Sequence, residues 1–349
     1  MPRVIRVDPI NPDREKLRIA ADILKRGGIV AFPTETVYGL GADALNPEAV
    51  KRVFQTKGRP PDNPIIVHIN SFDMLYQVAE SSGEDIERIL RILWPGPFTV
   101  ILRKKAIVPS VTTAGLPHVA VRMPAHPVAL GIIEELRRPI AAPSANKSGR
   151  PSPTVAEHVI EDLGDSVDLV VDGGETFFGV ESTIIDLTGE SPTLVRPGPI
   201  DPEYLENIIG KKILIPPFAR GFGEAEKAIA PGTKYRHYAP DKQLLLIENI
   251  NNSCIERIAK DLINRGLKIC VVGYREFLYI RETLGIEYIS MGSLNNKYEI
   301  ARNLYKALRS VDRAQADLCI VLGVDERGIG LAIMNRLRKA SGGNIIRCQ

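Results

Sequence analysis

Short apolar runs alternate with amphipathic stretches along the first two hundred residues. Runs rich in valine and isoleucine are typical of buried strands, whereas apolar residues spaced three and four apart predict helices. We expect strands over residues 29–32, 65–69, 99–102, 119–122, 169–172 and 183–187. We expect helices over 14–25, 47–55 after a possible cap at Asn46, 85–93, 128–137 and 155–163. This mixture favours an α/β domain around one large twisted sheet.

A second periodic region begins after Pro240. Strands are expected over 244–247, 268–273, 288–290 and 318–323, with helices over 255–264 and 300–309. One face of the last helix carries apolar side chains at helical spacing, which are Ala301, Leu304, Tyr305 and Leu308. Strand–helix–strand repetition predicts a smaller, Rossmann-like domain with a parallel sheet.

The segment between these regions is rich in proline and glycine, which is typical of a linker or an extended arm. We therefore expect domains over 1–215 and 241–349, joined by a linker over 216–240. The linker carries the aromatic and cationic run KYRHY at 234–238. Such a run favours a lid that closes over a site in the first domain and excludes water from it.

Composition sets broad limits on the protein's class. The 349 residues are 44% hydrophobic and 25% charged, which are ordinary globular values. We find no apolar run of the ~20 residues needed to cross a membrane and no signal peptide, so we expect a soluble, cytoplasmic protein. A net charge of +3 is too small for a nucleic-acid-coating protein, and any anion site must come from local clustering.

The cysteines lie in the second region only, at Cys254, Cys270, Cys319 and Cys348. No two of them have CxxC spacing, which argues against a zinc site and against a disulfide framework. We expect them to be reduced and buried in the core.

The sequence lacks a Walker-type loop and a GxGxxG loop, so any nucleotide phosphates must be held by other means. One polar segment follows the first strand and reads FPTETVYGLGAD over 32–43. Its hydroxyls can donate and accept hydrogen bonds, and its glycines let the backbone pass close to a ligand. An ordinary turn with solvated threonines remains the alternative.

Two cations occupy a proline-rich loop with the sequence KGRPPDNP, namely Lys57 and Arg59. On a stiff loop they are suited to clamp a phosphate or carboxylate, although such a pair is also common on surfaces. His68 lies in the apolar strand that follows, where a satisfied core histidine is the usual explanation.

A third polar segment, PIAAPSANKSGRPSPT over 139–154, opens from a strand of small residues and ends at a helix start. Its serines, asparagine and cations are typical of an anion cradle, and an N-cap at Thr154 is the simpler alternative. Arg122 and Arg196 each end an apolar strand. In open α/β sheets, ligands bind at such strand ends.

These motifs and four others occur in a fixed order: FPTETVYGLGADA, KGRPPDNPIIVHI, WPGPFTVIL, VAVRMPAHP, PIAAPSANKSGRPSPT, ESTIID and LVRPGPI. Together they resemble the threonylcarbamoyl-AMP synthase (YrdC-like) family over about residues 10–205. The linker APGTKYRHYAP and the later ERGIGLAIMNR resemble the long, two-domain form of that enzyme.

The resemblance implies a YrdC-like twisted mixed sheet and a reaction in which L-threonine, bicarbonate and ATP with Mg²⁺ give threonylcarbamoyl-adenylate and pyrophosphate. A downstream transferase complex then modifies tRNA beside the anticodon. The implied catalytic residues are Lys57, Arg59, Ser144 and Asn146. Those four would also contact the nucleotide, together with Asn63, Thr113, Ser152, Arg196 and His237. The implied threonine-side residues are Thr34, Thr36, His68, Arg122, Ala142, Ser182 and Tyr235.

Two other interpretations stay open at this point. An RNA-binding module without catalysis would also present a basic hollow, although the net charge is low and exposed interleaved aromatics are lacking. A carbamoyltransferase of the hydrogenase-maturation type carries a similar domain, but it adds paired CxxC motifs that this sequence lacks.

Overall fold

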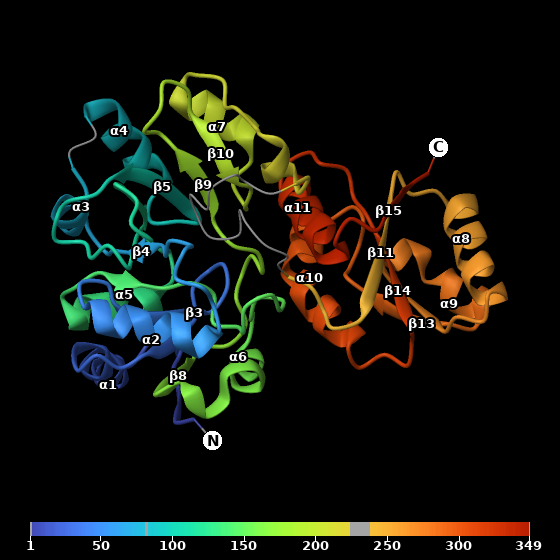
Figure 1. Cartoon of the computed structure of the whole chain (residues 1–349), viewed down its shortest axis with the longest axis horizontal. Coiled ribbons are helices and arrows are strands. Elements are labelled where there is room, and N and C mark those ends of the chain that lie inside the picture. The colour runs from blue at the N-terminus through green and yellow to red at the C-terminus, as the bar shows by residue number, and fades with distance from the viewer. Residues whose placement is uncertain (1, 81–82, 224–237, 349) are drawn as a thin grey trace.

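The computed structural model describes residues 2–80, 83–223 and 238–348. A mixed sheet of ten strands forms the larger, N-terminal part (Figure 1). The strands in spatial order are β1 (Val4–Arg6), β8 (Leu169–Asp172), β2 (Val30–Phe32), β3 (Gly39–Asp43), β7 (Ile140–Ala141), β4 (Val67–His68), β6 (His118–Arg122), β5 (Phe98–Arg103), β9 (Thr183–Asp186) and β10 (Thr193–Arg196). The sheet contains parallel pairs, such as β4 with β6, and antiparallel pairs, such as β5 with β6.

Helices pack against this sheet through amphipathic faces. α1 begins after Asp13, whose carboxylate accepts from the amide of Glu15, and it buries Leu17, Ala20, Ala21 and Leu24 on one face. That face packs against α5 and the sheet. The helices of this part are α1 (Arg14–Lys25), α2 (Pro47–Lys57), α3 (Phe72–Val78), α4 (Glu84–Leu93), α5 (Pro127–Leu136), α6 (Ala156–Leu163) and α7 (Pro202–Ile209).

The C-terminal part is an all-parallel sheet of five strands, which confirms the Rossmann-like prediction. Its strands in spatial order are β13 (Glu287–Ser290), β12 (Ile269–Gly273), β14 (Leu318–Leu322), β11 (Gln243–Glu248) and β15 (Ile345–Arg347). The helices are α8 (Asn252–Asn264), α9 (Tyr279–Leu284), α10 (Lys297–Val311) and α11 (Gly330–Ser341). No helix of the described residues is both long and apolar enough to cross a membrane.

Helices α10 and α11 face the N-terminal part, while α8 and α9 lie on the far side of the small sheet (Figure 1). Buried ion pairs join the two parts, with Arg309 on Asp162 at 2.7 Å and Arg336 on Glu181 at 2.9 Å. Leu331 of α11 packs into the N-terminal core. The two sheets are therefore joined by a buried contact as well as by the connecting chain.

The connecting chain begins with a short 3₁₀ turn, Pro217–Arg220, which packs against α11. Asn335 of α11 donates to the carbonyl oxygen of Ala219 at 2.9 Å. Residues 224–237 lie outside the described residues, and with them most of the predicted lid. The lid and the domain boundaries at 215 and 240 stay predictions.

The structure corrects three expectations about local structure. Gly39–Asp43 is a strand, antiparallel to β2, although its glycines and alanine gave no strand signal. The strand expected over 65–69 shortens to Val67–His68. Lys57 is the last residue of α2 and not part of a loop, because the helix continues to Gly58, which caps it with a φ of 59°.

The prediction of reduced cysteines is wrong. The four cysteines form two disulfides, which are Cys254–Cys348 and Cys270–Cys319. Cys270 and Cys319 lie opposite one another on β12 and β14, with their Cα atoms 4.6 Å apart. The partners are 94 and 49 residues apart in sequence, so spacing along the chain gave no sign of their proximity.

Candidate functional site

Most of the predicted residues gather around a cavity at the ends of several strands of the large sheet. β4, β6 and β10 end at His68, Arg122 and Arg196, which all line it. The loops after α2 and β7 supply much of the remaining wall. The predicted residues that line it are Thr34, Thr36, Lys57, Arg59, His68, Arg122, Ala142, Ser144, Asn146, Ser152, Ser182 and Arg196.

Lys57 connects α2 with the loop after β7. Its side chain is buried, 4% exposed, and its ammonium nitrogen donates to the carbonyl oxygens of Ser144 and Asn146, each at 2.5 Å. Burial, and then the charge of Arg59, hold the pKa of Lys57 well below its ordinary value. An anion bound in the cavity would raise the pKa of Lys57 again, because it favours the charged ammonium.

The loop that Lys57 holds is fixed by its own polar groups. The Asn146 side-chain amide donates to the carbonyl oxygens of Lys147 and Arg150, at 2.8 and 2.9 Å. The amide of Ala145 donates to the carbonyl oxygen of Tyr38 at 2.9 Å, which ties the loop to β3. The loop does not cap the next helix, because α6 begins at Ala156 without a side-chain cap. The alternative interpretation of this segment, an N-cap at Thr154, is therefore wrong.

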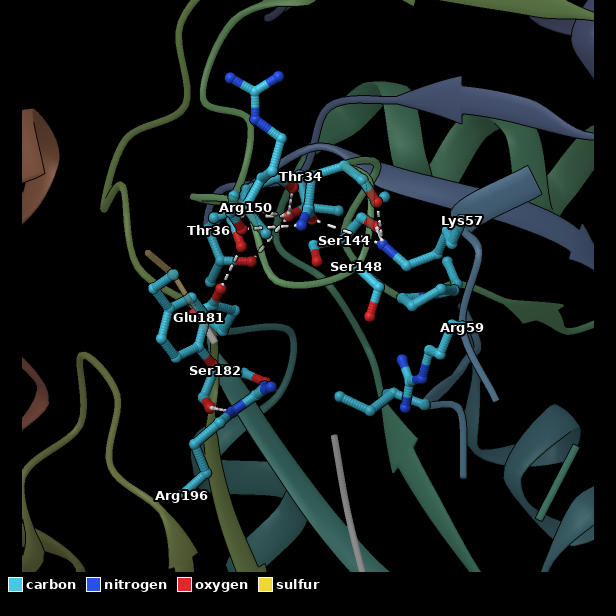
Figure 2. Close-up of a pocket in the computed structure, with 18 of the residues that line it drawn as sticks. Thr34, Thr36, Lys57, Arg59, Ser144, Ser148, Arg150, Glu181, Ser182 and Arg196 are labelled. Atoms are coloured by element: carbon cyan, nitrogen blue, oxygen red, sulfur yellow. Dashed lines mark hydrogen bonds between the residues drawn. The ribbon is translucent and has the colours of Figure 1, made fainter. Parts of the chain in front are cut away.

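Arg59 lies opposite Arg196 across the hollow (Figure 2). One nitrogen of its guanidinium donates to the carbonyl oxygens of Asn63 and Pro64, at 3.0 and 3.2 Å. Its Nε is buried without a hydrogen-bond partner among the described residues. Burial lowers the pKa of Arg59 to about 10, with Asp62 opposing that shift, so the guanidinium remains charged at neutral pH.

A chain of hydrogen bonds links Arg122 to the two threonines of the first motif. Arg122 Nη1 donates to Thr36 Oγ1 at 2.9 Å, and Thr36 Oγ1 lies 2.8 Å from Thr34 Oγ1. Thr34 gives its only hydroxyl proton to the carbonyl oxygen of Val37 at 2.7 Å, so Thr36 must donate to Thr34. The Thr36 oxygen can therefore only accept a hydrogen bond from a ligand.

The same arginine forms a buried ion pair with Glu35, at 2.6 Å. Its Nε donates to the carbonyl oxygen of Gly96 at 3.3 Å. Among the described residues its five N–H donors make two hydrogen bonds, to Thr36 and Gly96, while Nη2 lies against Glu35 without hydrogen-bond geometry. Glu35 was not among the predicted residues, and it fixes the orientation of Arg122 from behind.

His68 lies beside Arg122 in the register of β4 and β6 and is buried. Burial, then the charge of Arg122, lower the pKa of His68 to about 3, so the imidazole is neutral at physiological pH. Its Nδ1 has no hydrogen-bond partner among the described residues. His68 itself lines the cavity, and this nitrogen lies beneath the cavity surface.

Arg196 and Ser182 form the opposite wall. Arg196 donates to the carbonyl oxygen of Ser182 at 3.1 Å and to its hydroxyl oxygen at 3.0 Å. The Ser182 hydroxyl also lies 2.7 Å from that of Thr99. Burial lowers the pKa of Arg196, and the neighbouring Tyr238 and Glu181 only partly offset this shift.

Glu181 is a buried carboxylate in the same wall, 6% exposed, and it was not predicted as a site residue. Ser152 donates to it at 2.6 Å, and Arg336 and Tyr305 of the C-terminal part contact it from behind. Burial raises the pKa of Glu181, but Arg336, Arg196 and the Ser152 hydrogen bond together lower it to about 2.

The structure does not bring every predicted residue to the cavity. Thr113 is buried away from it and donates to the carbonyl oxygen of Leu116 at 3.0 Å. Asn63 is buried behind Arg59 and does not line the wall. Tyr235 and His237 lie outside the described residues. The lining residues that sequence reasoning missed are Val37, Gly39, Ile66, Pro143, Ser148, Gly149, Arg150, Glu181 and Tyr238.

Two family models match consecutive parts of the chain. The model for telomere recombination proteins of the Sua5, YciO and YrdC type matches residues 22–198, and the model for the C-terminal domain of threonylcarbamoyl-AMP synthase matches 200–342. The chain is 49% identical to the threonylcarbamoyl-AMP synthase of Pyrococcus abyssi over 340 residues, which cover 95% of this chain and 96% of that protein. The chain belongs to the threonylcarbamoyl-AMP synthase family.

Further comparisons support this membership. The threonylcarbamoyl-AMP synthase of Bacillus subtilis is 42% identical over 344 residues, 97% of each chain. A crystal structure of Pyrococcus abyssi Sua5 complexed with L-threonine superimposes with a TM-score of 0.92 at 48% identity, covering 99% of both chains. The family resemblance and the predicted fold class are thereby confirmed. Relatives in the threonylcarbamoyl-AMP synthase family are named as enzymes, which favours an enzyme over an RNA-binding module.

Proposed function

We propose that this chain makes L-threonylcarbamoyl-adenylate from L-threonine, bicarbonate and ATP, with release of pyrophosphate. The observation that carries the proposal is full-length identity of 49% to a threonylcarbamoyl-AMP synthase. The cavity fits this chemistry because Lys57, Arg59, Arg122 and Arg196 all line it, while ATP and bicarbonate are anions and threonine carries a carboxylate. The relative solved with L-threonine supports threonine as the amino acid.

ATP would occupy the side of the cavity formed by Lys57, Arg59 and the loop that carries Ser144 and Asn146. The positive charges of this side oppose the repulsion between a triphosphate and an incoming carbamate. Binding of the triphosphate would favour the protonated form of Lys57, which burial alone disfavours. Ser152 and Arg196 would contact the nucleotide from the opposite wall.

Threonine would bind at the ends of β4 and β6. Arg122 suits the substrate carboxylate, because a guanidinium fork matches carboxylate geometry. Thr36 can only accept, so it suits a donor of the substrate, either the amine or the hydroxyl. His68, which is neutral, lines the same part of the cavity.

The reaction needs no covalent enzyme intermediate. The threonine nitrogen attacks the carbon of bicarbonate, and water is lost to leave a carbamate. A carbamate oxygen then attacks the α-phosphorus of ATP, and the bond to the bridging oxygen breaks as pyrophosphate departs. Holding the two reactants aligned supplies as much as about 7–11 kcal/mol of the barrier reduction, the scale of well-oriented intramolecular reactions.

We place Mg²⁺ on the nucleotide, as part of the substrate. Among the described residues there is no group of three or more histidine, cysteine, aspartate or glutamate side chains suited to hold a metal ion. Glu181, a carboxylate of the lining, is already held by Arg336 and Tyr305. Mg²⁺ bound to triphosphates usually keeps several of its waters, which fits entry as the magnesium complex of ATP.

The product would supply a downstream transferase complex that modifies adenosine next to the anticodon of tRNA, in the cytoplasm. A mixed anhydride of a carbamate and AMP is an activated acyl donor, which is what such a transfer requires.

An omission series tests the proposal. Pyrophosphate release is measured with ATP, threonine and bicarbonate together and with each left out in turn. We expect release only when all three are present. Release without threonine would indicate a plain ATP pyrophosphohydrolase, and salt-sensitive RNA binding without release would indicate a binding module.

A further inference from the structure

The C-terminal domain reaches the wall of the cavity through one carboxylate. Arg336 of α11 donates to Glu181 Oε2 through Nε at 3.1 Å and Nη2 at 2.9 Å. Tyr305 of α10 donates its hydroxyl to the same carboxylate, with oxygens at 2.8 and 3.0 Å. Arg336 and Tyr305 are both 0% exposed. Arg336 and Tyr305 are 155 and 124 residues away from Glu181 in the chain, so these contacts form only when the two domains are docked.

The other side of Glu181 faces the cavity. Its Oε1 accepts the hydroxyl proton of Ser152 at 2.6 Å, and both side chains line the hollow. Figure 2 shows Glu181 on the same wall as Ser182 and Arg196. Glu181 is therefore a junction between residues of the C-terminal domain and a residue predicted to contact the nucleotide.

A buried carboxylate beside a triphosphate site would normally oppose binding, because like charges repel strongly where water is scarce. Arg336 carries the compensating charge, and its third nitrogen is held by the carbonyl oxygen of Pro197 at 2.5 Å. We propose that Arg336 and Tyr305 are positioning residues for ATP, through which the C-terminal domain neutralises Glu181 and fixes it as the acceptor for Ser152. The inference rests on the proposed function, because it assigns ATP to this cavity.

The compensation sets a pH dependence that can be measured. Burial raises the pKa of Glu181, and Arg336 is the strongest of the groups that lower it to about 2. Without Arg336 that pKa rises, so the carboxyl becomes neutral in mild acid and charged at higher pH. The groups of both domains that face Glu181 are Lys57, Ser152, Arg196, Tyr238, Tyr305 and Arg336.

The test is the dissociation constant of ATP, measured by calorimetry on full-length protein between about pH 5.5 and 8.5. For Arg336→Met we expect ATP binding about tenfold weaker or more at the upper end, and a smaller loss at the lower end. Threonine binding should change little. The double variant Glu181→Gln with Arg336→Met removes both charges, and we expect it to regain most of the affinity and the wild-type pH profile.

A matched control separates this role from simple domain docking. Arg309→Met removes a second buried ion pair between the domains, with Asp162, which does not line the cavity. We expect it to lower thermal stability and to leave the pH profile of ATP binding like that of the wild type. Tyr305→Phe keeps the ring and should weaken ATP binding less than Arg336→Met does.

The outcomes separate the inference from the proposed function. Unchanged ATP affinity in Arg336→Met, or a loss without pH dependence that the double variant does not relieve, would overturn the positioning role. If Arg336→Met fails to fold, the double variant is compared with Glu181→Gln alone. Once the carboxylate is gone, Arg336 has no charge to neutralise, so we expect the two proteins to bind ATP with equal affinity. Unequal affinities would overturn the positioning role. If the wild-type protein binds ATP with an affinity that depends on Arg336 but releases no pyrophosphate, the proposed activity is refuted and the positioning role stands.

Discussion

The ammonium nitrogen of Lys57, at the end of α2, lies 2.5 Å from the carbonyl oxygen of Ser144, in the loop after β7. It lies equally close to the carbonyl oxygen of Asn146. One side chain thus both supplies positive charge to the cavity and holds the loop that forms its wall. Truncation of Lys57 would therefore remove a structural contact as well as a charge.

Replacing Lys57 with alanine should affect rate and stability together. Pyrophosphate release should slow by ~2–4 kcal/mol of barrier, the scale of one electrostatic contact in an active site. The free energy of unfolding should fall by about 1–3 kcal/mol, because two carbonyl oxygens lose their donor. Lys147→Ala, an exposed lysine of the same loop, is the control and should change neither. Normal turnover in a folded Lys57→Ala protein would refute the assignment.

Substrate choice should follow the hydroxyl of the amino acid. We expect threonine ahead of serine by ~1–3 kcal/mol, the value of one methyl group in such a pocket. Valine has nearly the same shape without the hydroxyl, and a site built to bind that hydroxyl rejects such an analogue by up to about 10⁴-fold. The measurement is kcat/KM for each amino acid in pyrophosphate release. Valine equal to threonine would show that the cavity does not bind the hydroxyl.

The disulfide Cys254–Cys348 should stabilise the C-terminal domain. It joins residues 94 apart and ties α8 to the end of the chain after β15. Cross-links that close such loops typically contribute about 2–4 kcal/mol. We expect the Cys254→Ser, Cys348→Ser double variant to melt at a lower temperature, while pyrophosphate release at 25 °C is retained. Reaction of all four thiols with iodoacetamide in unreduced, denatured protein would contradict both disulfides.

His68 should make stability depend on pH in a defined window. Its pKa is lowered from 6.5 to about 3 in the folded protein by burial and by Arg122. Below pH 6.5 the unfolded chain takes up a proton that the folded protein refuses, so the free energy of unfolding falls toward pH 3. The slope is at most about 1.4 kcal/mol per pH unit, and it vanishes above neutral pH.

Chemical denaturation at several pH values measures this slope. His68→Phe should show a shallower fall between pH 6.5 and 4 than the wild type does. His118→Gln, at the partly exposed start of β6, is the matched control and should follow the wild type. Identical slopes for wild type and His68→Phe would contradict a buried, neutral His68.

Sequence patterns predicted those elements whose signals are local. The helix Arg14–Lys25 has an N-cap, an acidic first turn and a regular apolar face, and its predicted bounds are confirmed. The strand Gly39–Asp43 was missed because GLGAD has no β-branched residue. Phe32 and Ile140 pack so closely on Gly41 that a side chain would not fit there, and the local sequence does not show this packing. Gly58 offered a readable sign that α2 continues to Lys57, since glycine commonly ends a helix in the left-handed region.

In the candidate site, too, local patterns predicted some residues and missed others. Arg122 and Arg196 end strands and Ser182 precedes one, so the sheet brings them together, and motif order was enough to propose them. Glu181 was missed because its partners Arg336 and Tyr305 come from the other domain. No local pattern encodes a contact between domains, and the same is true of the disulfides.

The most direct test of the central claim is the mass of the product. The purified protein is incubated with ATP, L-threonine and ¹³C-labelled bicarbonate, and the mixture is analysed at once by liquid chromatography and mass spectrometry. We predict an adenylate that contains both threonine and the labelled carbon, formed in step with pyrophosphate. A threonyl-adenylate without the label, or AMP and pyrophosphate formed without any amino-acid adduct, would contradict it.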